Sequence, residues 1–499
     1  YIPKRDWSSD VCSSDLMASV DFWLGVRQTL LAAAYAALMI WTYRRVVGLF
    51  DGEPLRRRAA LPWSFGLLLL AGCDFLAIRG GTGASVANVS KVYFSSNMFL
   101  NHAATNPVFS FLTTLGDHTD YASEYPFFDE TTRAAKFDAL RGNGPASGPS
   151  ERVLTKTRPN VVVVILESFA RTVMDADVDG RPVMPNMRRL RDEGIWFENF
   201  FANSFRTDRG EVAVLSGFPA QTRMSIMKLP AKSRSLPSLA RSLAREGYAT
   251  SFVYGGDLNF TNQASYMYAT GWQQLVWQRD LRFDTPPSDW GYDDAVMCDW
   301  FADRVIAQSG TGEPFLAGLL TLSSHRPFDV PFSRFDDREL NAFAFADDCV
   351  GRMVDKLKAS PAWDDLLVVL VADHGYPWPR SLSYNEPLRH RIPMIWTGGA
   401  VAGPRVVEEY ASQIDICATI LGQLEVAHDD FDYSKDIFAP PPPRKFAYYT
   451  FNDGFGVVDA SGEAVWDATS GKAVSETSPA LMDVGRTMLQ TTYTDIGNR

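Results

Sequence analysis

Residues 160–167 of this 499-residue chain read Asn-Val-Val-Val-Val-Ile-Leu-Glu, and this stretch decides the fold. Every side chain from Val161 to Leu166 is apolar, so a strand here has no polar face and is expected to be covered by helices on both sides. Four further predicted strands are rich in apolar and β-branched residues, at Ala249–Tyr254, Phe315–Leu322, Leu366–Ala372 and Ile392–Thr397. Predicted helices accompany them, at Met187–Glu193, Leu236–Glu246, Ala342–Lys358 and Gln413–Leu424. This alternation predicts an α/β fold with a doubly wound sheet.

Polar residues directly follow three of the predicted strands. Glu167 follows the first strand, His325 follows the strand at 315–322, and Asp373 and His374 follow the strand at 366–372. In open α/β sheets, ligands bind beyond the carboxyl ends of the strands. These side chains are therefore expected to form one functional site.

Thr207 stands in the run Asn-Ser-Phe-Arg-Thr-Asp-Arg-Gly at 203–210, just before a predicted helix at 211–215. A threonine at a helix start is most often only an N-cap, but the same position also binds anions through backbone amides. Arg206 and Arg209 are the candidate side chains for binding phosphate oxygens there, although either could equally face solvent.

The threonine oxygen, two carboxylates and an imidazole form a mixed ligand set that suits manganese, magnesium or zinc. An ion held by Glu167, Thr207, Asp373 and His374 would lower the pKa of the threonine hydroxyl and neutralise developing charge. The set therefore points to a nucleophilic threonine acting on a phosphoryl-type group.

The remaining histidines divide into candidates and bystanders. His325 is expected to protonate a leaving group or to hold a substrate phosphate, with a loop histidine bonded to backbone as the alternative. His390 is equally compatible with the rim of the site and with a structural role. His102, His118 and His428 lie outside the predicted site.

The motifs LESF with Glu167, the Thr207 segment, SSHRPF with His325 and ADHG with Asp373 and His374 resemble the lipoteichoic acid synthase branch of the alkaline phosphatase/sulfatase superfamily. Order and approximate spacing agree across residues 158–425, and the connector NHAATNPVFSFL is also similar. The resemblance implies one divalent metal, Mn²⁺ first, with Mg²⁺ or Zn²⁺ as alternatives. It implies that Thr207 attacks a phosphatidylglycerol-like lipid, releases diacylglycerol and passes the group to a glycan or glycerol-phosphate acceptor.

One element departs from that family. Its His-Gly-Asn element, followed by a tryptophan and an arginine that help to bind glycerol phosphate, is replaced here by Tyr-Gly-Gly-Asp-Leu-Asn-Phe-Thr-Asn at 254–262. Asp257 and Asn262 are therefore the predicted contacts to a different head group.

Four other functions compete with this one, and the first of them lacks its required motif. A true sulfatase needs a C/S-x-P-x-R pattern, which does not occur around position 207. A phosphoethanolamine transferase, or a phosphodiesterase that uses water as acceptor, would use the same threonine. A catalytically inactive membrane scaffold would need no metal.

The rest of the chain divides by composition. Residues 1–16 resemble translated sequencing adapter and are set aside as an artefact. Residues 17–80 contain two predicted transmembrane helices, Phe22–Tyr43 and Leu61–Ile78, and the arginines between them predict a cytoplasmic loop. A connector and linker (81–157), a catalytic domain (158–430) and a C-terminal extension (431–499) follow.

This layout predicts an N-terminally truncated protein of the bacterial inner membrane, with its catalytic domain on the extracytoplasmic side. A net charge of −11 without a basic tract gives no reason to expect nucleic-acid binding. The cysteines show no paired spacing, so buried free thiols are expected rather than disulfides.

Overall fold

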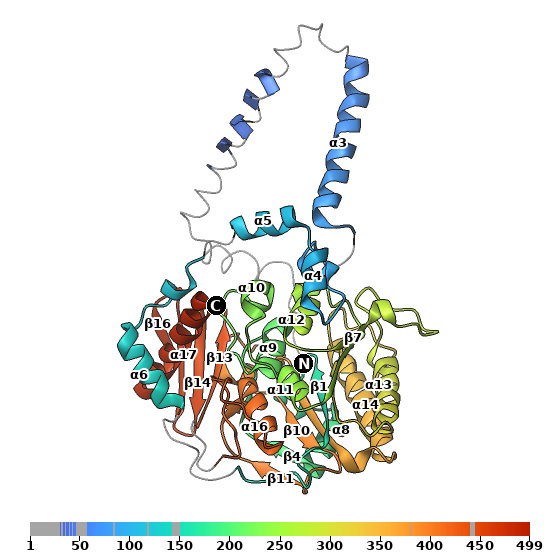
Figure 1. Ribbon diagram of the computed structural model, residues 1–499, viewed down its shortest axis with the longest axis vertical. Coiled ribbons are helices and arrows are strands. Elements are labelled where there is room, and N and C mark those ends of the chain that lie inside the picture. The colour runs from blue at the N-terminus through green and yellow to red at the C-terminus, as the bar shows by residue number, and fades with distance from the viewer. Residues whose placement is uncertain are drawn as a thin grey trace. The chain divides into compact units, whose positions relative to one another are not determined.

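The computed structural model describes parts of residues 30–45 and residues 57–499 except 83–84, 117–118, 142–149, 380 and 440–444. The described chain divides into two units, Tyr1–Ile78 and Arg79–Arg499. The larger unit contains the core and the candidate site (Figure 1).

An eight-stranded sheet forms the centre of the larger unit, in the order β11-β4-β10-β9-β1-β8-β6-β7. The strands are β1 (Asn160–Leu166), β4 (Ile195–Phe197), β6 (Ala249–Tyr254), β7 (Gln274–Trp277), β8 (Phe315–Leu320), β9 (Leu366–Ala372), β10 (Met394–Thr397) and β11 (Arg405–Val407). β1 is fully buried and pairs in parallel with β8 and β9, and Val163 lies between Gly318 and Val369. The all-apolar stretch therefore is the centre of the sheet, as predicted.

The sheet is mixed rather than purely parallel. β10 runs antiparallel to both β9 and β4. It begins at Met394, two residues later than predicted, and Pro393 before it has no N–H to donate to a ladder. The α/β class is confirmed, with this reversed strand as the difference.

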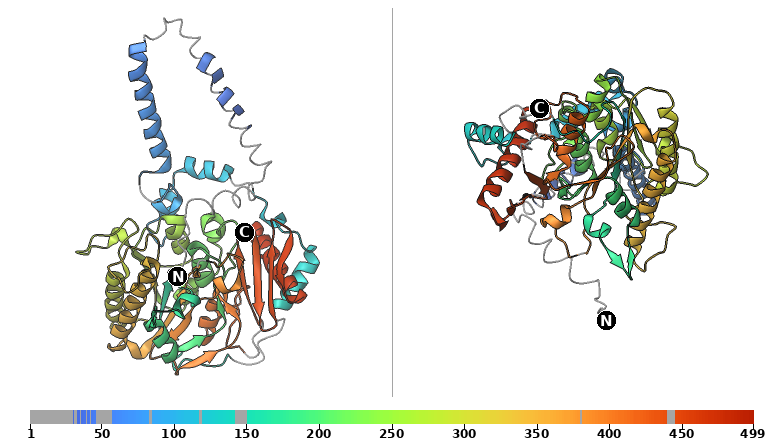
Figure 2. Two further views of the ribbon diagram at one scale, coloured as in Figure 1. Left: turned by 180° about the vertical axis from the view of Figure 1, so that it is seen from behind. Right: turned by 90° about the horizontal axis from the view of Figure 1, so that it is seen from below.

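Helices cover both faces of the sheet (Figures 1 and 2). One layer contains α8 (Pro185–Glu193), α13 (Asp294–Ser309) and α14 (Arg338–Lys358), and α14 contacts both of the others. The other contains α9 (Thr207–Ser216), α11 (Leu239–Arg245), α12 (Gln263–Ala269) and α16 (Ile416–Gln423). These two layers bury the apolar side chains of β1, β8 and β9.

A second sheet extends the core at the C-terminal end. It is antiparallel, with β13 (Phe446–Phe451), β14 (Gly454–Asp459), β15 (Gly462–Asp467) and β16 (Lys472–Glu476) in that order. Helix α17 (Pro479–Asn498) packs against this sheet and against α6 (Glu130–Arg141) (Figure 2). The C-terminal part of the chain therefore forms a small antiparallel sheet and a helix that the sequence did not predict.

The connector joins the core through polar contacts. The Tyr125 hydroxyl lies 2.9 Å from Thr222 Oγ1, which lies 2.8 Å from the Tyr493 hydroxyl of α17. Upstream, Ser85 Oγ donates to Asp257 Oδ2 at 2.9 Å, and Asn88 Nδ2 donates to the Asn259 carbonyl at 2.7 Å. Connector, sheet and C-terminal helix thus belong to one packed unit.

The predicted transmembrane helices are not shown. Most of the first span, Phe22–Tyr43, lies outside the described residues, and the second, Leu61–Ile78, falls within α3 (Arg57–Arg79). In the described part of the chain, no helix is sufficiently long and apolar to cross a membrane. The described cysteines, Cys73, Cys298, Cys349 and Cys417, are free thiols.

Candidate active site

A cavity of about 470 Å³ opens at the carboxyl ends of β1, β8 and β9. Its walls include Glu167, Thr207, His325 and His374, from four separate segments of the chain. The structure therefore brings together the polar residues that follow the three predicted strands, and it adds the start of α9.

Glu167 is held rigidly at the end of β1. Its backbone N–H donates to Thr321 Oγ1 at 2.8 Å, and its carbonyl accepts from Ser324 Oγ at 2.6 Å. Its Oε1 accepts from Ser168 Oγ at 2.7 Å. Ser168 has a φ of 60°, an uncommon conformation for a residue other than glycine and one that clusters at functional sites.

Asp373 and His374 are fixed at the end of β9. Asp373 is fully buried, and its Oδ1 accepts from the backbone N–H groups of Ser168 and His374, each at 2.7 Å. The Asp373 carbonyl accepts from Gln413 Nε2 at 2.6 Å. His374 Nδ1 lies 3.1 Å from the Gly375 carbonyl, which orients the ring so that Nε2 faces the two carboxylates.

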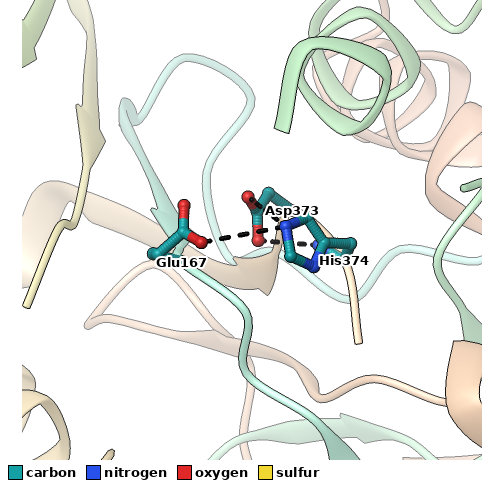
Figure 3. A group of neighbouring side chains, drawn as sticks. All are labelled: Glu167, Asp373 and His374. Carbon is teal, nitrogen blue, oxygen red and sulfur yellow. Dashed lines mark hydrogen bonds and ion pairs between the residues drawn. The ribbon is translucent and has the colours of Figure 1, made fainter. Parts of the chain in front are cut away.

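Glu167, Asp373 and His374 form a compact ligand cluster (Figure 3). One potential ligand atom from each lies within 4.8 Å of the others. His374 Nε2 is 3.7 Å from Glu167 Oε1 and 3.4 Å from Asp373 Oδ2, and Asp373 Oδ2 has no hydrogen-bond partner among the described residues. Burial, reinforced by Asp373, raises the pKa of Glu167 well above its ordinary value. Two adjacent buried carboxylates, one with an unpaired oxygen, fit a divalent cation.

Thr207 is the first residue of α9, which begins four residues earlier than the predicted helix at 211–215, and Arg206 takes the N-cap position. Thr207 Oγ1 donates to Glu167 Oε2 at 3.4 Å, so the hydroxyl faces the ligand cluster. Gly210, one turn along, lets α9 approach β9 closely, because a Cβ there would lie 2.1 Å from the Asp373 carbonyl oxygen. A threonine oxygen, two carboxylates and an imidazole therefore converge at the start of a helix, where backbone amides favour anions.

His325 lines the same cavity from the loop after β8. Its Nδ1 lies 2.7 Å from the Arg326 carbonyl, and its ring packs on Trp290 with centroids 4.5 Å apart. Burial lowers the pKa of His325, which favours the neutral imidazole. Asp294 holds this loop, because its carboxylate accepts from the backbone N–H groups of Leu322 at 2.8 Å and Ser323 at 2.9 Å.

Of the predicted substrate-binding residues, some line the cavity and others do not. Arg206 lines the cavity, with its Nε 3.5 Å from Asp208 Oδ1. Arg209 is buried under Phe205, 5.0 Å from the ring centroid, and does not line the cavity. His390 is also buried away from it, stacked on Tyr449 at 4.0 Å, and burial lowers the pKa of His390 to about 3.

Asp257 and Asn262 likewise do not line the cavity. Asp257 accepts from Ser85, and Asn262 adopts a φ of 68° just before α12. The same segment instead presents Phe260, Thr261 and Gln263 to the cavity. The segment therefore contributes to the site through neighbours of the predicted residues.

Sequence reasoning missed several residues near the cavity. Trp290, Tyr384 and Arg389 line it, and Glu211 is buried one turn after Thr207. Burial, with Asp373 and Asp208 nearby, raises the pKa of Glu211 well above its ordinary value. For Glu211 a signal existed, since position 211 lies four residues after Thr207 on the same helix face. Trp290 and Tyr384 lie on irregular segments, and Arg389 lies on the single-turn helix α15 (Pro387–His390), so the sequence does not specify their direction.

A doubly wound α/β sheet with this carboxylate–imidazole–threonine site defines an enzyme of the alkaline phosphatase type. The family model named Sulfatase matches residues 159–426, and the chain belongs to the sulfatase family.

Comparison with curated proteins finds relatives in bacteria. The chain is 26% identical over 313 residues to phosphoglycerol transferase I of Xanthomonas axonopodis pv. citri, covering 57% of this chain and 43% of that protein. It is 24% identical over 307 residues to lipoteichoic acid synthase 2 of Bacillus subtilis, covering 54% and 46%. The matched region spans less than half the length of each of these relatives.

Solved structures share the fold. A protein of the alkaline phosphatase superfamily from Vibrio parahaemolyticus matches with a TM-score of 0.65 and 22% identity, covering 76% of this chain and 98% of that one. The lipoteichoic acid synthase LtaP from Listeria monocytogenes matches with a TM-score of 0.63 and 22% identity, covering 73% and 98%. The similarity extends over most of the larger unit and identifies the fold.

Proposed function

We propose that this chain is a membrane-anchored, metal-dependent transferase that moves a phosphoglycerol-type group from a phospholipid to an acceptor hydroxyl through an ester on Thr207. One observation carries the proposal: the Thr207 hydroxyl lies 3.4 Å from Glu167, inside the cluster with Asp373 and His374. The names of the curated relatives, phosphoglycerol transferase I and lipoteichoic acid synthase 2, support a phosphoglycerol group. A glycan or glycerol phosphate is the proposed acceptor.

Glu167, Asp373 and His374, together with Thr207, would hold one divalent ion. Oxygen donors with one imidazole suit Mn²⁺, with Mg²⁺ and Zn²⁺ as alternatives. When bound, the ion lowers the pKa of the threonine hydroxyl and neutralises charge on phosphoryl oxygens.

In the loaded site Thr207 Oγ1 would give up its proton to solvent, and in the first half-reaction this oxygen forms a bond to the donor phosphorus. The bond from phosphorus to the diacylglycerol oxygen breaks, and that oxygen takes a proton and leaves as diacylglycerol. Phosphoglycerol then remains on Thr207 as a diester. Arg206, at the start of α9, lies on the cavity wall where phosphate oxygens would sit.

In the second half-reaction, an acceptor hydroxyl attacks the same phosphorus and the bond to Thr207 Oγ1 breaks. His325 is suited to take the acceptor proton, because its Nδ1 is bonded to the Arg326 carbonyl and burial keeps the ring neutral. By the reverse path, the protonated ring can deliver a proton to the diacylglycerol oxygen in the first half.

A phospholipid donor places the enzyme at a membrane surface. In the larger unit, α4 (Met98–Ala104) and α5 (Pro107–Gly116) expose apolar side chains, with Phe99 75% and Phe111 63% exposed. We assign the catalytic unit to the extracytoplasmic face of the bacterial inner membrane. Co-sedimentation with phosphatidylglycerol vesicles tests this assignment, which fails if Phe99→Asp and Phe111→Asp bind as the wild type does.

Intact-mass spectrometry of the full chain with Mn²⁺ and phosphatidylglycerol tests the reaction. We expect one added glycerophosphate unit on Thr207, absent in Thr207→Ala and retained in Thr207→Ser. Release of diacylglycerol without an adduct, and without any acceptor product, would indicate hydrolysis instead of transfer. Turnover by Thr207→Ala at the wild-type rate would rule out the threonine ester.

A further inference from the structure

Arg389 is a buried arginine that faces the active-site cavity from α15 (Pro387–His390). It is 7% exposed, and its guanidinium lies over the Tyr384 ring, 4.1 Å from the centroid. Its Nε is buried without a hydrogen-bond partner, and no carboxylate of the described residues lies within ion-pair distance of it. Burying a cation is costly unless an anion compensates it.

The other arginines near the cavity have an acidic partner or are exposed to water. Arg391, two residues later, pairs with Glu198 at 2.7 Å, and Arg206 lies 3.5 Å from Asp208. Arg326 also lines the cavity but is exposed, so water solvates it. Arg389 combines burial, contact with the cavity and the absence of an acidic partner among the described residues.

The surrounding structure fixes Arg389 close to the reacting groups. Its carbonyl packs against Gly375, the residue after His374, where a Cβ would lie only 1.9 Å from that oxygen. Tyr384, which supports the guanidinium, contacts Phe205 edge-to-face at 4.7 Å, two residues before Thr207. The arginine is therefore tied to both the metal-ligand segment and the nucleophile segment.

We propose that Arg389 binds the anionic oxygens of a substrate phosphate. A guanidinium offers parallel N–H donors that match two phosphate oxygens, and a ligand would supply the charge that Arg389 lacks. The inference rests on the proposed function and specifies it further. The phosphate belongs either to the diester of the donor or to a phosphate on the acceptor.

Calorimetry on the Mn²⁺-loaded full chain, with inorganic phosphate and with glycerol 3-phosphate as probes, tests this site. We expect Arg389→Lys to weaken binding about 10-fold and Arg389→Ala about 100-fold, the range for charge-assisted hydrogen bonds. Added guanidinium ion at millimolar concentration should restore part of the affinity to Arg389→Ala, which a purely structural role would not allow. Arg171→Ala is the control, since the half-buried Arg171 is also stacked on an aromatic ring, Trp196 at 4.7 Å, but pairs with Asp175 and does not line the cavity.

Kinetics then distinguish the two sources. A rise confined to the KM for phosphatidylglycerol assigns the donor diester, and a rise confined to the KM for a glycerol-phosphate acceptor assigns the acceptor. Phosphate affinities of Arg389→Lys and Arg389→Ala within twofold of the wild type would overturn the inference while leaving the transfer reaction intact. A wild type that binds phosphate through Arg389 but transfers nothing from phosphatidylglycerol would instead refute the proposed function alone.

Discussion

Glu167 and Asp373 place two carboxyl groups side by side where water is excluded. Burial and the Asp373 charge both raise the pKa of Glu167, so the metal-free folded protein retains a proton there at a pH where an exposed glutamate has lost it. A group with a raised pKa stabilises the folded state at low pH, and this contribution is lost as the pH rises. Metal-free protein is therefore expected to lose stability on this account as the pH rises above about 4.5, the ordinary value for glutamate.

Metal binding should consequently release protons. We expect calorimetric titration with Mn²⁺ near pH 6 to show proton release, measured by comparing buffers of different ionisation enthalpy, and affinity should increase with pH. The thermal midpoint gap between metal-loaded and chelator-treated protein should widen from pH 5 to pH 8. Asp373→Asn should reduce both effects. Binding without proton release would contradict the buried-pair interpretation.

Asp294, which is not part of the ligand cluster, should give the stability of the protein a second dependence on pH. Burial raises the pKa of Asp294 from 3.8 to about 6 while its carboxylate holds the loop that leads to His325. Its stabilising contribution is complete below about pH 4 and is lost as the pH rises through about 6. The unfolding free energy of the wild type minus that of Asp294→Asn should therefore fall by about 3 kcal/mol between about pH 3 and about pH 7. Urea unfolding at several pH values measures this difference, and a constant difference would refute it.

The sequence predicts the positions of some site residues and not of others. Glu167, Asp373 and His374 lie where predicted, because a strand end determines the edge of the sheet at which the next residues lie. The sequence does not show that Arg389 rather than its neighbour His390 faces the cavity, because α15 is a single turn of four residues. A turn that short has no periodicity from which to read which neighbour faces the cavity.

Helix α9 is the element that positions the nucleophile, and it depends on Gly210. In Gly210→Ala the new methyl group would lie 2.1 Å from the Asp373 carbonyl oxygen, so helix and strand end must separate. We expect a loss of about 1–3 kcal/mol in stability and a fall in kcat of at least 10-fold, since small displacements of reacting groups are costly. Gly310→Ala is the control, because its Cβ would meet the Ala307 oxygen at 3.3 Å. Full activity in Gly210→Ala would show that the close approach is not needed.

The central strands were predicted well, but two of the longest helices, α13 and α17, and the shortest strands were not. β1, β6 and β9 match their predicted bounds because runs rich in apolar, β-branched and aromatic residues are typical of buried strands. β4 and β11 contain three residues each, too few for a pattern. Helix α17 is rich in threonine and contains glycine, and its packing against the C-terminal sheet stabilises a helix that propensity does not favour.

At the scale of the whole molecule, the connector is part of the core. Tyr121, Tyr125 and Phe137 are each at most 7% exposed, and the Tyr125 hydroxyl belongs to the hydroxyl chain that reaches α17. A fragment of residues 151–499 loses all three side chains. At about 1.5–3 kcal/mol per buried side chain, we expect it to be at least about 5 kcal/mol less stable than the fragment 79–499.

Thermal unfolding of the two fragments, with Mn²⁺ present in both, measures this difference. The longer fragment should show one cooperative transition, because connector, sheet and α17 share buried contacts. Equal midpoints would mean that the connector is only a tether.

The bonds from Ser85 to Asp257 and from Asn88 to Asn259 lie just upstream of Phe260 and Thr261, which form part of the cavity wall. The stretch that precedes the catalytic core therefore supports the rim of the substrate cavity. If the proposed function holds, we expect substitutions in that stretch to change head-group selectivity without altering a residue that lines the cavity. In chimaeras that exchange residues 85–90 between relatives, the preference for a head group should then follow the origin of the exchanged segment. A segment that looks like a spacer would in that case help to determine the substrate.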